Sequence, residues 1–274
     1  MKRYNLLLSV IWICLLILFV LFAPGTILAE AGGLTVEEIV RKTNEAAYYA
    51  GKDGRAGVSM EIKDKQGRTR EREFVILRKN KEGLKQLFYV YFQRPADVRK
   101  MSFLVWKNVE KDDDRWLYLP SLDLVKRIAA GDKRTSFAGS DFFYEDISGR
   151  SVFGDTHSLE KETEEYYILK NIPKDPDSVE FSNFVMKIDK NTFIPEKVEY
   201  FNRQGKLYRE YEALETKEIQ GYPTVIHSVM RDLESGSETS IEFKNTEYDI
   251  GLDDSIFTER YLRRPPRKWL TIRP

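Results

Sequence analysis

Three acidic side chains in a short aromatic stretch are the residues of this chain best placed to do chemistry. Asp141 and Glu145 would share one face of a helix, and Asp146 follows directly. Paired carboxylates at such spacing serve acid–base hydrolysis. Segments rich in acids and serine also form caps and turns, in which these carboxylates would cap backbone amides or pair with Lys133 and Arg134. We favour this structural interpretation and predict no catalytic residue.

The other candidate sites for metal or phosphate chemistry are weaker. The two histidines, His157 and His227, lie far apart and lack metal-ligand spacing. The run 112–114 holds three aspartates, but it lacks the spaced ligands and the turn glycine of a calcium loop, so we interpret it as a solvated hairpin tip. The glycine pair at 32–33 does not join a strand to a helix, as a phosphate-binding loop would. We therefore predict neither a metal site nor a cofactor.

The charge balance excludes one large class of partner. The chain has 44 basic and 44 acidic residues, so its overall charge gives no bias toward nucleic acid or an anionic surface. Basic residues gather only near the carboxyl end, where Pro265 and Pro266 cannot continue a helix or a central strand. We expect residues 265–274 to form an extended, solvated basic tail, with contact to a membrane or partner as the alternative.

The amino end has the order of segments that directs export. Two basic residues precede an apolar run over Leu6–Phe22, and small residues at 29–31 complete a cleavage site. We predict a secretory signal peptide over residues 1–31, whose removal takes away the single cysteine, Cys14. The apolar run approaches the roughly 18 residues that indicate a membrane span. An uncleaved anchor over residues 6–23 is therefore the alternative.

The elements that follow are one helix and then many strands. Apolar residues at helical spacing predict a helix over residues 35–50, ended by Gly51 and Gly54. From Val58 the pattern has a period of two, and short turns imply antiparallel pairing in one curved sheet or a barrel. The strands are expected at 58–63, 71–78, 84–92, 101–107, 115–119, 124–128, 166–170, 184–188, 197–201, 206–211, 224–231 and 239–248.

Several of these strands carry large apolar residues on both faces. In the strand over 84–92, Phe88 and Phe92 share one face while Tyr89 and Tyr91 share the other. A sheet solvated on one side alternates more cleanly. Either helices cover the second face, or the sheet curls around an apolar cavity. The composition leaves both explanations open. An exported β-rich chain of this kind is more typical of a binding protein than of an enzyme.

Five stretches of the sequence resemble a known family. Residues 115–120 read Arg-Trp-Leu-Tyr-Leu-Pro, 126–128 read Lys-Arg-Ile, and 136–146 read Ser-Phe-Ala-Gly-Ser-Asp-Phe-Phe-Tyr-Glu-Asp. Together with residues 193–200 and 254–262, they resemble the outer-membrane lipoprotein-sorting protein family, in the LolA-like group associated with lipid transporters of the resistance-nodulation-division type. The resemblance covers roughly residues 54–264, and its most specific part is the stretch at 136–146.

This resemblance implies a fold and a function. The fold is mainly β, a strongly curved antiparallel sheet that forms a half-open barrel with a few covering helices, as one domain over residues 32–264. The implied function is a periplasmic carrier that holds acyl chains of a lipoprotein or lipid and passes them toward the outer membrane. The implied partners are an inner-membrane transporter of the resistance-nodulation-division type and an outer-membrane acceptor. A transporter-associated lipid-binding or sensor module would have the same fold, and a carboxylate-dependent hydrolase is the third alternative.

Two sets of site residues follow from the strand pattern and from the stretch at 136–146. The first set is expected to line the cavity, because its members come from consecutive strands and share faces with other apolar residues. It comprises Met60, Phe74, Phe88, Phe103, Trp116 and Tyr118. The second set is expected to form a gate or a partner contact that follows the polar residues 131–134. It comprises Phe137, Asp141, Phe142, Phe143, Glu145 and Asp146. As exposed caps or ion pairs, its acids would contribute about 1 kcal/mol each.

Overall fold

The computed structural model describes residues 33–271, so the predicted signal peptide over residues 1–31 lies outside the described part. The residues from Val36 onward form one compact unit. Its first element is helix α2, Val36–Tyr48, which confirms the helix predicted from the apolar spacing. Within residues 33–271 no helix has the length and apolar character needed to cross a membrane.

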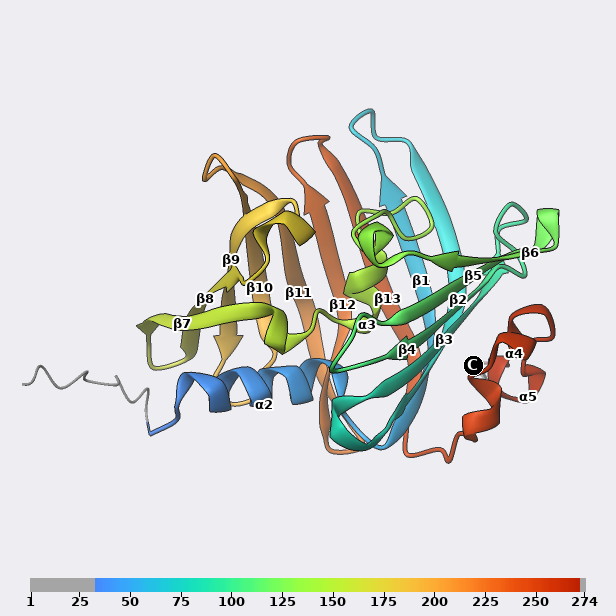
Figure 1. Ribbon diagram of the computed structural model, residues 1–274, viewed down its shortest axis with the longest axis horizontal. Helices are drawn as coiled ribbons and strands as arrows, with labels where there is room; N and C mark the ends of the chain where they lie inside the picture. Colours follow the sequence, from blue (N-terminus) through green and yellow to red (C-terminus); the bar gives the residue numbers. More distant parts are fainter. Residues whose placement is uncertain (1–32, 272–274) are drawn as a thin grey trace, which may run out of the picture. The chain divides into compact units, whose positions relative to one another are not determined.

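Thirteen strands form a single antiparallel sheet, as the sequence pattern and the family resemblance predicted (Figure 1). The strands of the first half are β1 (Asp53–Lys63), β2 (Thr69–Asn80), β3 (Gln86–Arg94), β4 (Ser102–Lys107), β5 (Asp114–Leu119) and β6 (Leu124–Ile128). The strands of the second half are β7 (Asp155–Glu162), β8 (Tyr166–Pro173), β9 (Phe181–Asp189), β10 (Pro195–Asn202), β11 (Leu207–Ile219), β12 (Tyr222–Asp232) and β13 (Ser237–Tyr248). Strand β7 was missed because its sequence, DTHSLEKE, is polar and has few residues typical of strands.

The strand order explains the path of the chain. It runs β6-β5-β4-β3-β2-β1-β13-β12-β11-β10-β9-β8-β7, so two meanders meet where β1 pairs with β13. Strands β6 and β7 are therefore the two opposite edges of the sheet, although they follow one another in sequence. The connection between them, residues 129–154, has to travel from one edge to the other. It includes the 3-10 helices η3 (Ala130–Asp132) and η4 (Val152–Gly154) and the short helix α3 (Tyr144–Ser148).

Side chains alternate between two apolar cores on the two faces of β1–β5. Phe103 belongs to the core on the concave face, together with Phe74, Phe88 and the connection residue Phe137. Its neighbour Leu104 belongs to the core on the opposite face. Both explanations for apolar residues on the two faces are therefore correct. Helices cover the convex face, and the sheet curves around an apolar cavity on the concave face.

The carboxyl-terminal residues cover the convex face of β1–β5 rather than extending into solvent. Helix α4 (Glu259–Arg263) and helix α5 (Arg267–Leu270) follow the 3-10 helix η6 (Asp254–Ile256) and pack on this face (Figure 1). Leu270 is buried, and its carbonyl accepts a hydrogen bond of 2.9 Å from the Gln93 side chain. The prediction of a solvated tail was wrong because Trp269 and Leu270 have apolar partners on the second face of the sheet, while the two prolines only separate the short helices.

The remaining short elements are turns. They are the 3-10 helices η1 (Glu82–Leu84), η2 (Pro120–Leu122) and η5 (Pro176–Ser178).

Candidate functional site

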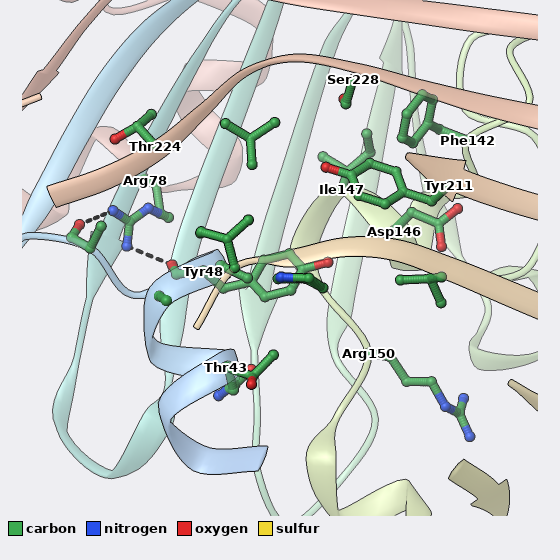
Figure 2. Close-up of a pocket in the computed structure, with 18 of the residues that line it drawn as sticks. Thr43, Tyr48, Arg78, Phe142, Asp146, Ile147, Arg150, Tyr211, Thr224 and Ser228 are labelled. Atoms are coloured by element: carbon green, nitrogen blue, oxygen red, sulfur yellow. Dashed lines mark hydrogen bonds between the residues drawn. The ribbon is translucent and has the colours of Figure 1, made fainter. Parts of the chain in front are cut away.

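A cavity of about 350 Å³ lies between the concave face of the sheet, helix α2 and the connection that contains α3 and η4 (Figure 2). Helix α2 contributes Val40, Thr43 and Tyr48 to the wall, so this helix packs on the concave side of the sheet. Strands β1–β3 form one wall and strands β7–β13 form the other. Cavities of this size are within the range that holds small-molecule ligands.

The wall of the cavity is mainly apolar. Its apolar side chains come from α2, from both meanders and from the connection, so residues distant in sequence converge on one space. They include Val40, Val58, Phe74, Ile76, Phe88, Phe142, Ile147, Met186, Val198, Met230, Ile241 and Phe243. Such a surface attracts ligands by non-directional burial of apolar area, at roughly 25 cal/mol per Å².

The charged side chains in the wall are already paired within the protein. Arg78 donates a hydrogen bond of 2.7 Å to the Tyr48 carbonyl at the end of α2 and another to the Ala50 carbonyl. Arg150 holds Asp155 through two hydrogen bonds of 2.8 Å. Burial lowers the pKa of Arg78, whereas the pKa of Arg150 is raised by its hydrogen bonds to Asp155 despite its burial. These charges hold the wall together rather than offering a free ion to a ligand.

Tyrosines add hydroxyl groups to the wall without adding charge. Tyr48, Tyr200 and Tyr211 line the cavity. Burial raises the pKa of Tyr200 and of Tyr211 to about 12 in each case, and it raises the pKa of Tyr48 further. All three are therefore neutral at physiological pH. They combine an apolar ring with a hydrogen-bonding group, which suits a ligand with a long apolar body and few polar atoms.

The residues predicted as a gate form a packed plug in the connection that crosses the concave face. Phe137 is 1% exposed, and its ring centroid lies 5.6–6.0 Å from those of Phe74, Phe92, Phe103 and Tyr144. Phe142 is also buried and lines the cavity, and Phe143 lies against the guanidinium groups of two arginines. We refer to residues 136–146 as the plug.

The acids of the plug have partners within the protein, in agreement with the interpretation based on caps and ion pairs. Glu145 is buried, and its carboxylate lies 3.2 Å from Arg134, 3.4 Å from Arg150 and 3.6 Å from Lys133. This arrangement differs from an exposed latch worth about 1 kcal/mol, because breaking a buried pair costs several kcal/mol.

The other two plug acids hold the plug to the sheet and to itself. Asp146 accepts a hydrogen bond of 2.7 Å from the Phe143 amide and pairs with Arg209 of β11. Asp141 accepts a hydrogen bond of 2.6 Å from the Thr239 hydroxyl, and its own amide donates to the same hydroxyl at 2.9 Å. The weakly held, exposed loop predicted from the sequence is therefore absent from this part of the structure.

Of the six predicted cavity residues, two line the cavity, two are buried in the concave core, and two lie on the convex face. Phe74 and Phe88 line the cavity. Met60 and Phe103 are fully buried in the same concave core but do not reach the cavity. Their role in binding lipid stays a prediction.

Trp116 and Tyr118 were predicted to line the cavity, and this prediction was wrong. Both lie in the convex core, beside Trp106 and the carboxyl-terminal helices, while Leu117 and Leu119 face the concave core. The two faces of β5 are both apolar, so the alternation itself does not tell which face is concave, and a slip of one residue exchanges the sets.

Many of the cavity residues that sequence reasoning missed come from α2 and from the second meander, and others come from β1, β2 and the connection. Thr43 and Tyr48 lie on the face of α2 that turns toward the sheet, and Tyr211 comes from β11 (Figure 2). Tyr200 comes from β10. The apolar spacing on α2 was a usable signal for its buried face. No comparable apolar spacing marked Tyr200 and Tyr211 as cavity residues, because polar and charged residues are interspersed along β10 and β11.

The remaining candidate residues also have structural partners. His157 contacts the Asn171 side-chain oxygen at 2.6 Å and the Val152 carbonyl at 2.8 Å. His227 contacts the Ser240 hydroxyl at 2.9 Å. At the β4–β5 turn, Asp113 pairs with Arg115 at 2.6 Å and is mostly buried, so only part of the predicted hairpin tip is solvated. Within residues 33–271 no three His, Cys, Asp or Glu side chains gather as metal ligands would.

Comparisons with known proteins identify the family. A family model described only as that of an uncharacterized protein matches residues 85–264. The chain belongs to this family. A protein from Desulfovibrio piger, described as a member of the DUF1329 family, is 29% identical; the match covers 82% of this chain and 96% of that one, with a TM-score of 0.76. No curated protein matches the chain.

Two further solved structures are similar to this chain over most of its length. A putative outer membrane lipoprotein-sorting protein domain from Vibrio parahaemolyticus is 27% identical over 83% of this chain and 97% of that chain, with a TM-score of 0.76. A LolA superfamily protein from Nitrosomonas europaea shares the fold, with a TM-score of 0.65 at 21% identity over 83% of this chain and 99% of that one. The fold and family expected from the sequence are thus confirmed.

Proposed function

We propose that this LolA-like protein is a periplasmic carrier that holds acyl chains of a lipoprotein or lipid in the cavity and passes them toward the outer membrane. The single observation that carries this proposal is the open cavity with an apolar wall, whose charged side chains have partners in the protein. An acyl chain needs apolar shielding, because each exposed methylene costs roughly 0.8 kcal/mol in water. It needs no fixed ion.

The wall is also suited to release. Its ligand contacts are apolar and aromatic, so a cargo can move along the cavity without breaking one dominant bond. The partners that this function implies are an inner-membrane transporter of the resistance-nodulation-division type as donor and an outer-membrane acceptor. The similarity to a protein described as lipoprotein-sorting supports this proposal.

A carrier is favoured over a carboxylate-dependent hydrolase by the surroundings of the plug acids. Asp141, Glu145 and Asp146 are each held by hydroxyl or guanidinium groups of the protein. A general acid or base has to reach the substrate, but here the acids bind neighbouring side chains. The Asp146 carboxylate also lies in the cavity wall, yet its partner Arg209 is buried beside it.

The carrier function is tested by filling the cavity. Ala47 is an exposed residue of α2 at the cavity wall, so Ala47→Trp adds volume to the cavity without disturbing a buried core. We expect this variant to bind a fluorescent fatty acid at least tenfold more weakly than the parent. Glu37→Trp is the matched control, because Glu37 is exposed on the same helix and does not line the cavity.

Lipid extraction of the purified mature protein identifies the cargo and separates the alternatives. A soluble protein that carries lipid, and loses it in Ala47→Trp but not in Glu37→Trp, supports the carrier. A protein that stays with the membrane and transfers nothing to acceptor vesicles would favour the transporter-associated module. Equal lipid content in both variants would refute the cavity as the binding site.

A further inference from the structure

The convex face carries a second hollow, separate from the cavity and different in chemistry. This convex groove lies between strands β3–β5 and the carboxyl-terminal helices, and its wall includes Lys100, Arg263 and Arg267. Tyr91 and Tyr118 contribute hydroxyl groups, and the wall contains no acidic residue. The groove is therefore cationic and polar, whereas the cavity is apolar.

Two of these three cations are not neutralised by an acid of the protein. Arg263 pairs with Asp123 at 3.0 Å. Among residues 33–271, no carboxylate lies within ion-pair distance of Lys100 or Arg267. Arg264 and Lys268 are exposed next to the groove in sequence and add to its positive charge. An uncompensated group of cations is complementary to an anionic surface.

Exposed leucines lie at the end of this cationic surface. Leu122 is 68% exposed, the highest exposure among the large apolar side chains of the described part, and Leu124 is 46% exposed. Both flank Asp123, whose carboxylate and carbonyl each accept a hydrogen bond of 3.0 Å from Arg263. The Tyr118 hydroxyl also donates to Asp123 at 3.1 Å. The turn over residues 122–124, called the leucine turn below, is thus held directly beside the groove.

We propose that this surface docks the protein on an anionic phospholipid bilayer. Lys100 and Arg267 would contact lipid phosphates, while Leu122 and Leu124 would enter the interface between head groups and acyl chains. Exposed apolar residues beside Lys and Arg are the combination that binds such membranes. The acidic residue in the turn, Asp123, does not oppose this, because Arg263 neutralises it. This inference does not depend on what the cavity holds.

Sedimentation with vesicles tests the proposal. The full protein should sediment with vesicles that contain phosphatidylglycerol, should sediment weakly with vesicles of phosphatidylcholine alone, and should be released at high salt. Lys100→Gln with Arg267→Gln should weaken binding about fivefold for each cation removed. Leu122→Ser with Leu124→Ser should also weaken binding, with the salt dependence retained.

Matched variants elsewhere on the surface control for charge and apolar area. Lys206→Gln with Lys217→Gln removes two exposed cations, and Leu214→Ser with Leu233→Ser removes two exposed leucines. Neither control should change binding by more than about twofold. Equal binding to the two kinds of vesicle would overturn the proposal, and so would parent-like binding of both groove and turn variants. Circular dichroism of every variant verifies that it is folded.

Discussion

The buried Arg209 of β11 forms an ion pair with the partly buried Asp146 of α3, which joins the second meander to the connection crossing the concave face. The same guanidinium donates a hydrogen bond of 2.9 Å to the Asp141 carbonyl and lies 4.1 Å from the centre of the Phe143 ring. One side chain thus contacts three residues in the second half of the plug.

We expect Arg209→Met to destabilise the protein by about 3–5 kcal/mol, because it leaves the Asp146 carboxylate without its main partner in a buried site. Urea unfolding followed by circular dichroism measures the change. Arg203→Met, at an exposed pair with Asp177, should change stability by less than about 0.5 kcal/mol. A combined Arg209→Met and Asp146→Asn variant should recover part of the loss, and a strictly additive loss would contradict direct coupling between the two residues.

Hydrogen exchange should show the plug to be as firmly held as the sheet. The Phe137 amide donates to the Phe142 carbonyl at 2.8 Å, and the Tyr144 amide donates to the Thr135 carbonyl at 3.1 Å. Because Phe137 is buried in the concave core, these amides should exchange only with large-scale opening of the sheet. Exchange of both amides at the rate of an exposed turn would restore the gate interpretation.

The tyrosines of the cavity predict a loss of stability in alkali. Burial raises the pKa of Tyr200 and Tyr211 from 10.0 to about 12, so between these values the folded state keeps protons that the unfolded state releases. Stability is therefore fully present below pH 10 and falls as the pH rises toward 12, by up to about 1.4 kcal/mol per pH unit for each group. Tyr200→Phe with Tyr211→Phe should flatten this slope in chemical unfolding measured from pH 9 to 12. An unchanged slope would contradict their burial as neutral groups.

The carboxyl-terminal helices should contribute to stability through the convex core. Leu270→Ala removes a buried side chain and should cost about 2 kcal/mol, at the low end for such substitutions because the residue lies near the chain end. Leu233→Ala, in an exposed turn, serves as the control and should have almost no effect. Equal midpoints of thermal unfolding for the parent and Leu270→Ala would mean that the tail does not pack in solution.

Local alternation and turn residues allowed the strands to be predicted from the sequence, whereas the family was predicted from the resemblance of five short stretches. Strand β6 begins and ends at the predicted residues, Leu124 and Ile128. The faces of β5 were not predictable, since Trp116 and Leu117 are equally suited to a core and only the curvature of the whole sheet decides which of them faces inward.

Only some partners of the plug acids could be predicted from neighbouring residues in the sequence. Glu145 with Arg134 is a short-range pair, and it was anticipated from the sequence. Asp146 with Arg209 is separated by 63 residues and depends on the route of the connection from β6 to β7. No local pattern contains that route.

Photocrosslinking of a bound acyl chain tests the central claim most directly. The parent protein would be loaded with a fatty acid that carries a diazirine near its methyl end, irradiated, digested and analysed by mass spectrometry. The account predicts crosslinks to cavity residues from both meanders, such as Phe88, Tyr211 and Ile241, and their loss in Ala47→Trp. Crosslinks confined to the convex groove, or none in a folded protein that was exposed to the probe, would contradict it.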